Sequence, residues 1–253
     1  MSRSKKTKLG PLSVLSVVRE LRRGGGDPRP LAVAGARELV PLLARELRAG
    51  GDASAVVEGR VDHAAVLVWV GPADEDELHK ADRSGIPIVA VSDDATLPYV
   101  LATDIVRVPR GSGFPVAEIA AMIARKLGED GTSLAARLPV LRRPVCDALI
   151  ASFAKRNGLI GAAVFVPGVD MPILTLNQIR LVLRIALAHG VELDNSRALE
   201  LLGVVGTGFG LRAAARELLD LVPVAGWAVK GAVAYSGTRA IGEAAVRYFE
   251  ARV

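Results

Sequence analysis

From residue 31 the sequence alternates between short apolar runs and segments with helical spacing, and this alternation limits the folds open to the chain. The apolar runs are LAVAG, AAVLVWV and IPIVAVS, and a shorter one, DIVRV, follows them. The helical segments are ARELVPLLAREL, DEDELHKADRSG and PVAEIAAMIARKLG. Strands that alternate with helices form parallel sheets covered on both faces. The sequence therefore predicts a small doubly wound, mostly parallel α/β domain over residues 28–133.

Beyond residue 133 the strand signal stops and only helical segments remain. We expect one helix from Pro144 to Arg156, ended by RNG, and another from Asp170 to Gly190. DNSRALELL, LRAAARELLDL and GWAVKGAVAYSGTRAIGEAAVRYFE supply further helices. The fold class is thus α/β plus all-α, with a helical domain over residues 134–253.

The last helical segment carries small residues that allow close packing of helices. Gly226, Gly231, Gly237 and Gly242 recur along it among several alanines. Small residues let two helix backbones approach closely, in membranes or in soluble bundles. We therefore expect Gly/Ala-rich packed helices in the second half of the chain.

Residues 1–27 form a third part, a basic arm followed by a short amphipathic helix and a linker. MSRSKKTK carries four basic residues, and Leu12, Leu15 and Val18 follow at helical spacing. For the first eight residues, a disordered, solvated arm is the favoured interpretation. GGGDPRP then predicts a flexible linker. A secretory signal is not expected, since the apolar run is short and no small-residue cleavage site follows.

Charge is distributed unevenly among these three parts. Residues 1–27 carry seven Lys/Arg and two Asp/Glu, net +5, and residues 28–133 carry eleven and sixteen, net −5. Residues 134–253 carry fourteen and nine, net +5, which completes the total of +5. A basic arm, an acidic middle and a basic end indicate separate units with separate partners.

The apolar stretch from residue 156 to 190 could be a membrane span, a lipid-facing hairpin or a buried core. In residues 158–176, nine Leu, Ile, Val and Phe contribute roughly −0.5 kcal/mol each to insertion, and Asp170 opposes them by about +3 kcal/mol before Gly and Pro are counted. The balance is close to zero. We therefore expect a hairpin buried in protein or resting on a membrane, rather than one that crosses it.

A polar stripe follows on the next helix, where Asn177, Arg180 and Arg184 share one face. One interpretation is a core helix whose stripe meets water or acidic neighbours such as Glu192. The other is an interaction surface for an anion or a lipid headgroup. These three residues are the only candidate site that the sequence offers.

No catalytic, cofactor or metal site is predicted. Cys146 is the only cysteine, which excludes an internal disulfide and favours a reducing compartment, and the three histidines are scattered. VAGARELV, after the first strand, lacks a phosphate-binding loop, and GTGFG lacks the dinucleotide spacing. The acidic run Asp74–Glu77 opens a helix, where negative charge is favourable by itself.

The second half of the chain resembles a known bacterial family. The segments RNGLIGAAVFVPGVDMPILTLNQIRLVLRIALAHG, LDLVPVAGWAVKG and AYSGTRAIGEAAVRYFE are similar to the domain of unknown function 697 family, related to the YcjF-like membrane proteins. The resemblance covers roughly residues 134–250. It implies a helical domain that often follows an Era-like GTPase domain, and several members are membrane proteins.

By the same resemblance, the middle of the chain looks like a degenerate GTPase domain. IPIVAVSDD lies where the guanine-reading Asn-Lys-x-Asp would lie, and it offers Asp93 and Asp94 but no Asn-Lys. We expect a non-enzymatic interaction or scaffold protein in the cytoplasm, with a protein partner such as a GTPase and an anionic membrane surface. The alternative is a GTPase-like switch with a non-standard loop. A third hypothesis, nucleic-acid binding through the basic arm, is weak because no aromatic residues accompany the lysines.

Overall fold

The structure is a computed structural model that describes residues 11–23, 27–59, 62–109, 111–163, 170–194 and 226–252. It divides into two compact units. One, here called the α/β unit, comprises residues 26–148 with 188–190, and the other, the helical unit, comprises residues 1–25, 149–187 and 191–253.

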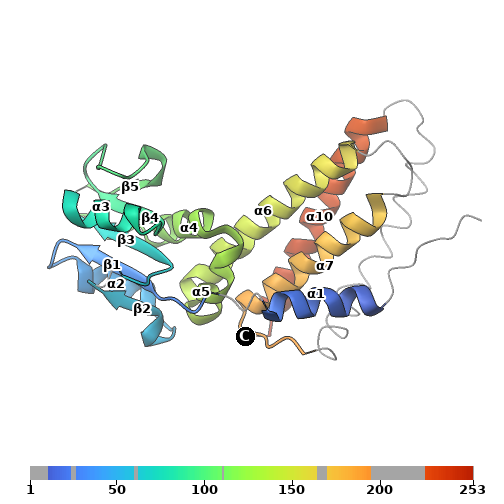
Figure 1. The fold of residues 1–253 in the computed structure, drawn as a ribbon, viewed down its shortest axis with the longest axis horizontal. Coiled ribbons are helices and arrows are strands. Elements are labelled where there is room, and N and C mark those ends of the chain that lie inside the picture. The colour runs from blue at the N-terminus through green and yellow to red at the C-terminus, as the bar shows by residue number, and fades with distance from the viewer. Residues whose placement is uncertain are drawn as a thin grey trace, which may run out of the picture. The chain divides into compact units, whose positions relative to one another are not determined.

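The α/β unit is built on a five-stranded sheet whose strands are all parallel, in the order β2-β1-β3-β4-β5 (Figure 1). The predicted fold class, a doubly wound parallel sheet followed by helices, is confirmed. The strand β2 was not predicted. The strands are β1 Leu31–Gly35, β2 Val56–Glu58, β3 Val66–Val70, β4 Ile88–Ser92 and β5 Ile105–Arg107.

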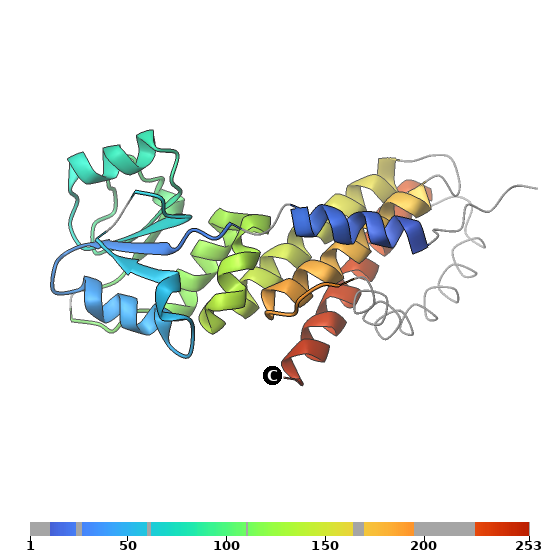
Figure 2. The same ribbon diagram turned by 60° about the horizontal axis from the view of Figure 1, so that its bottom comes forward.

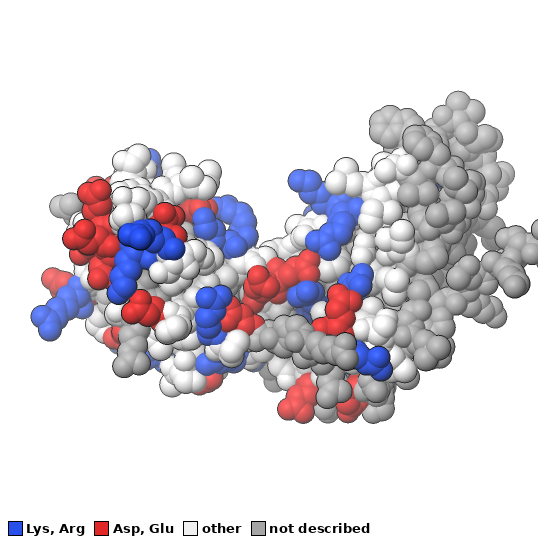
Figure 3. All heavy atoms as spheres, viewed as in Figure 1, with Lys and Arg blue, Asp and Glu red and all other residues white. Residues whose placement is uncertain are grey.

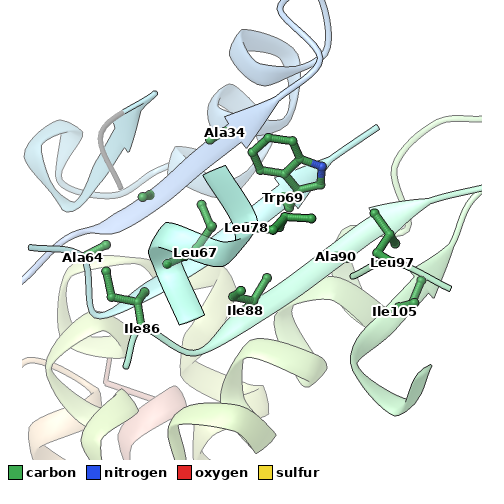
Figure 4. Packing of buried hydrophobic residues seen from close by; sticks show 12 residues of the cluster. Ala34, Ala64, Leu67, Trp69, Leu78, Ile86, Ile88, Ala90, Leu97 and Ile105 are labelled. Carbon is green, nitrogen blue, oxygen red and sulfur yellow. The ribbon is translucent and has the colours of Figure 1, made fainter. Parts of the chain in front are cut away.

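The core of the α/β unit lies on both faces of this sheet. All five residues of β3 and of β4 are buried, as expected for central strands of a covered parallel sheet. Helix α3 (Glu75–Arg83) packs Leu78 and Ala81 on one face (Figure 4). Helices α2 (Val40–Arg48) and α4 (Val116–Leu127) each bury one apolar face and contact each other.

Trp69 is the largest side chain in the cluster on the α3 face. Its ring is buried, and its Nε1 donates a hydrogen bond to the carbonyl oxygen of Pro72 at 2.9 Å. The indole therefore adds apolar area to the core while its one polar group is satisfied. This bond also fixes the turn that leads from β3 to α3.

Three short 3₁₀ turns and a short helix complete the α/β unit. The turn η1 (Ala53–Ala55) precedes β2, η2 (Ala102–Asp104) precedes β5, and η3 (Gly128–Gly131) follows α4. Asp104 is buried and forms ion pairs with Lys126 and Arg125, which attach η2 to α4. Helix α5 comprises Thr132–Arg137.

Helix α6 corrects the prediction of a helix from Pro144 to Arg156. It runs without interruption over Pro139–Ala163, through Pro144 and Gly158. Its residues up to 148 belong to the α/β unit, and the rest belong to the helical unit. Residues 129–137, around the division expected at residue 133, form η3 and α5, and Leu134 and the following Leu138 are buried.

The helical unit contains α1 (Pro11–Arg23), the second part of α6, α7 (Asp170–Ala188) and α10 (Gly226–Glu250) (Figure 2). Helix α7 begins at the predicted Asp170, and Gly190, which follows its end, has a φ of +77°. The helices predicted within residues 195–225, and the GTGFG turn, lie outside the described residues.

Helices α6 and α10 pack closely through glycine. A Cβ added at Gly161 would lie 2.9 Å from Ala234 Cβ and 3.0 Å from the Lys230 carbonyl oxygen. One added at Gly231 would lie 3.0 Å from the Gly158 carbonyl oxygen. The small-residue surface predicted on the last helix thus faces a second one on α6.

Among the described helices, none combines the length and the apolar character that a bilayer crossing requires. Residues 164–169, in the middle of the apolar stretch weighed above, are outside the described part of the chain.

Candidate functional site

The carboxyl edge of the parallel sheet is where open α/β sheets bind their ligands. The order of the strands reverses between β1 and β3, and the crevice at such a switch point is the usual binding position. In this chain, Gly35 ends β1, Val70 ends β3 and Ser92 ends β4. A nucleotide phosphate in such a fold would lie against the turn after β1.

That turn is closed against β3. The N–H group of Ala36 donates to the Val70 carbonyl oxygen at 2.7 Å. Gly35 has a φ of +122°, and a Cβ there would lie 2.1 Å from the same oxygen. A Cβ added at Gly71 would lie 2.8 Å from the Cβ of Ala36, so Gly71 also packs closely against this turn. The turn therefore packs on protein backbone at the position where a phosphate loop would open toward its ligand.

The start of α2 also lacks the donors of a phosphate cradle. The N–H groups of Leu39 and Val40 both donate to the Ala36 carbonyl oxygen, at 2.9 and 3.0 Å. Pro41 has no N–H, and it stands where a phosphate loop that began at Gly35 would have its lysine. The exposed carboxylate of Glu38 lies in the same turn. The exposed guanidinium of Arg37 beside it only balances this charge, so the turn presents no net positive charge to an anion.

A depression of about 510 Å³ lies beside the closed turn, over the ends of β3, β4 and β5. We call it the edge depression. Part of its lining is polar, and Ser92 within it accepts a hydrogen bond from the N–H of Asp94 at 3.2 Å. Leu42 on its α2 side is 45% exposed. The apolar lining includes Leu39, Leu42, Val70, Val91, Val108, Pro109 and Phe114, and the polar lining includes Arg45, Glu46, Ser92, Asp93 and Ser112.

The chemistry of the edge depression suits contact with apolar groups. Its volume is in the range of small binding sites, and leucine, valine and phenylalanine side chains form much of its lining. Asp93, at the position compared above with a guanine-reading motif, lies on its edge, and both Asp93 and Asp94 are exposed. Both residues directly follow the end of β4, and no Asn-Lys pair accompanies them.

The acidic run is explained by the start of α3. Asp74 accepts a hydrogen bond from the N–H of Glu77 at 3.2 Å and so caps the helix. Figure 3 shows acidic side chains gathered over this part of the α/β unit. Within the described residues, no group of three or more His, Cys, Asp or Glu is arranged to hold a metal ion.

The structure separates the three predicted interaction residues. Asn177 is buried, so it is not part of a surface, and its Nδ2 donates to Asn157 Oδ1 at 2.8 Å. Arg180 pairs with Glu20 of α1, with Nη2 and Oε2 at 2.9 Å, and Arg184 is half-buried. The acidic neighbour of Arg180 is thus Glu20, whereas the sequence suggested Glu192.

Asn177 belongs to a buried polar network that the sequence did not reveal. Asn157 Nδ2 and Gln178 Nε2 donate to Thr238 Oγ1 at 2.9 and 3.1 Å, and Thr238 Oγ1 donates to the Ala234 carbonyl oxygen at 2.7 Å. The network joins α6, α7 and α10. No sequence signal pointed to it, since Asn157 directly follows Lys155 and Arg156 and RNG is typical of a helix end.

Comparisons of the chain with protein-family models, with curated proteins and with solved structures found no match. The resemblance to the domain of unknown function 697 family stays a prediction.

Proposed function

We propose that the chain is a non-enzymatic interaction protein whose α/β unit binds a partner protein at the edge depression. The helical unit and the basic arm associate with the cytoplasmic face of a membrane. In this role, the carboxyl edge of the sheet, where doubly wound folds usually bind their ligands, contacts apolar groups of the partner protein instead.

The closed turn after β1 is the observation that carries this proposal. Nucleotide enzymes of this architecture need backbone N–H groups free to bind phosphate. Here the Ala36 N–H is bonded to Val70, and the next donors face the Ala36 carbonyl. The edge depression beside the turn is partly apolar and accessible. An apolar side chain of a partner fits this chemistry better than a triphosphate does.

The nucleotide part is tested by calorimetry of the full chain with GTP and ATP in the presence of Mg²⁺. We expect no binding at micromolar concentration, because neither the cradle nor the phosphate lysine is present. A Kd in that range would overturn the proposal and favour the alternative of a GTPase-like switch with a non-standard loop.

The partner part is tested by comparing two exposed leucines of the same unit. Leu42 lines the edge depression, whereas Leu101 is exposed and does not line it. Proteins cross-linked to the chain in its own cells should be lost from Leu42→Glu and retained by Leu101→Glu and wild type. Equal capture by all three proteins would mean that the partner binds outside the edge depression. Circular dichroism checks that both variants fold.

A further inference from the structure

Helix α1 lies against the other helices of the helical unit, with its apolar side turned toward them. Val17 and Val18 are buried, whereas Ser16, Arg19 and Glu20 are exposed. Figures 1 and 2 both show α1 beside α7. The helix is thus amphipathic in the folded chain, and its apolar side has an intramolecular partner.

One ion pair joins α1 to α7 at the surface. Glu20 Oε2 lies 2.9 Å from Arg180 Nη2, and the two side chains are 56% and 32% exposed. Exposed pairs of this kind are weak and screened by salt. We call this pair the latch, because it joins α1 to α7 through a carboxylate that is mostly exposed to water.

The composition around α1 is that of a helix that binds an anionic surface. The sequence places Arg3, Lys5, Lys6 and Lys8 before it, and three consecutive glycines after it. A basic amphipathic helix binds at the lipid–water interface by burying its apolar side and placing its cations near anionic headgroups. The same valines cannot be buried in the protein and in lipid at once.

We propose that α1 is the membrane-binding element and that it exchanges between two positions. In the closed position it lies on α7 and is held by the latch, and in the open position its apolar side enters an anionic bilayer. Lipid therefore competes with the helical unit for Val17 and Val18. This inference rests on the membrane association proposed above and names the element and the contact that control it.

Arg180→Glu separates this mechanism from simple charge attraction. The variant replaces the latch by repulsion with Glu20 and also removes positive charge from the protein. Attraction alone predicts weaker binding to vesicles of phosphatidylglycerol and phosphatidylcholine. The exchange predicts stronger binding, by about fivefold, since the closed position loses its pair. Hydrogen exchange of residues 11–23 should also become faster without vesicles.

Two controls accompany this variant. Arg239→Glu makes the same charge change at an exposed residue of α10 and should bind more weakly than wild type, with unchanged exchange in α1. The double variant Glu20→Arg with Arg180→Glu restores an opposite pair. It should return the exchange of residues 11–23 to the wild-type rate, and pure phosphatidylcholine vesicles should bind none of the variants well.

Each result bears on a distinct claim. If wild type binds anionic vesicles and Arg180→Glu binds no better, the exchange is overturned while membrane association stands. If exchange in α1 rises without a rise in binding, α1 is not the membrane-binding element. If neither wild type nor Arg180→Glu binds anionic vesicles, both the exchange and the proposed membrane association are overturned.

Discussion

The amide of Asn157 illustrates how single polar residues specify the helical unit. It donates to Thr238 of α10 and accepts from Asn177 of α7, all within the core. Buried polar groups are costly unless every partner is in place, so this network disfavours other alignments of the three helices. Sequence reasoning cannot supply such a network, because the partners are 20 and 81 positions away from Asn157.

Replacing Asn157 by Ala should destabilise the protein strongly. The change leaves Asn177 Nδ2 without its acceptor in a buried position, so the free energy of unfolding should fall by about 2–3 kcal/mol. Urea unfolding followed by circular dichroism measures this. Lys155→Ala, at an exposed residue of the same helix, should change the value by less than about 0.5 kcal/mol.

Asp52 makes part of the stability of the α/β unit dependent on pH. Hydrogen bonds from the Ser54 side chain, then the Ser54 backbone, then Arg137, hold its pKa below the ordinary 3.8. Because the folded pKa is lower than the unfolded one, the stabilisation is present above pH 3.8 and is lost as pH falls through the folded pKa.

Asp52→Asn should therefore lower the free energy of unfolding at neutral pH, and the difference from wild type should shrink in acid. Urea unfolding at about pH 7 and at several values below about pH 4 gives this difference. A difference that stays constant with pH would show that the carboxylate charge does not matter.

At the scale of the element, the strands were easier to predict than the ends of the helices. The runs LAVAG, VLVWV and IVAV are apolar because both faces of a central strand are covered, so β1, β3 and β4 follow from the sequence. Helix α6 did not follow, since Pro144 and Gly158 normally mark ends. At Gly158 the close contact of α6 with α10 outweighs the local preference.

Enlarging Gly161 should push α6 away from α10. A Cβ at this position already meets Ala234 Cβ at 2.9 Å, so Gly161→Leu should lower the free energy of unfolding by about 2 kcal/mol or more. Thermal unfolding measures the loss. Ala163→Leu, two residues further along the helix at an exposed position, is the matched control and should be close to neutral. An equal effect of both would argue against close packing at Gly161.

At the scale of the whole molecule, the uneven distribution of charge predicts that the basic N-terminal segment strengthens attachment to anionic membranes. Lys5, Lys6 and Lys8 belong to a segment of net +5, and each basic residue near an anionic lipid surface contributes about 1 kcal/mol. Replacing all three by Gln should move protein from the membrane fraction to the supernatant at low salt. High salt or carbonate should release the wild type in the same way, and release by detergent alone would contradict this prediction.

The candidate site shows where prediction from sequence reached its limit. The missing phosphate motif after β1 was visible in VAGARELV, but the closure by Val70 was not, because it depends on the neighbouring strand. The stripe of Asn177, Arg180 and Arg184 was correct in its spacing. The interpretation as a core helix with acidic neighbours agrees with the Arg180–Glu20 pair, but the neighbour itself was not identified, since helical spacing defines a face and does not say what covers it.

The burial of Trp69 has a practical consequence for spectroscopy. Trp69 and Trp227 are the two tryptophans of the chain, and each compact unit contains one of them. Indole emission moves to longer wavelength when a buried ring meets water, so Trp227→Phe leaves a chain whose fluorescence reports the α/β unit alone. A denaturant curve of this variant then follows the α/β unit without an added dye, and a midpoint that coincides with that from circular dichroism of the whole chain would mean that both units unfold in one cooperative step.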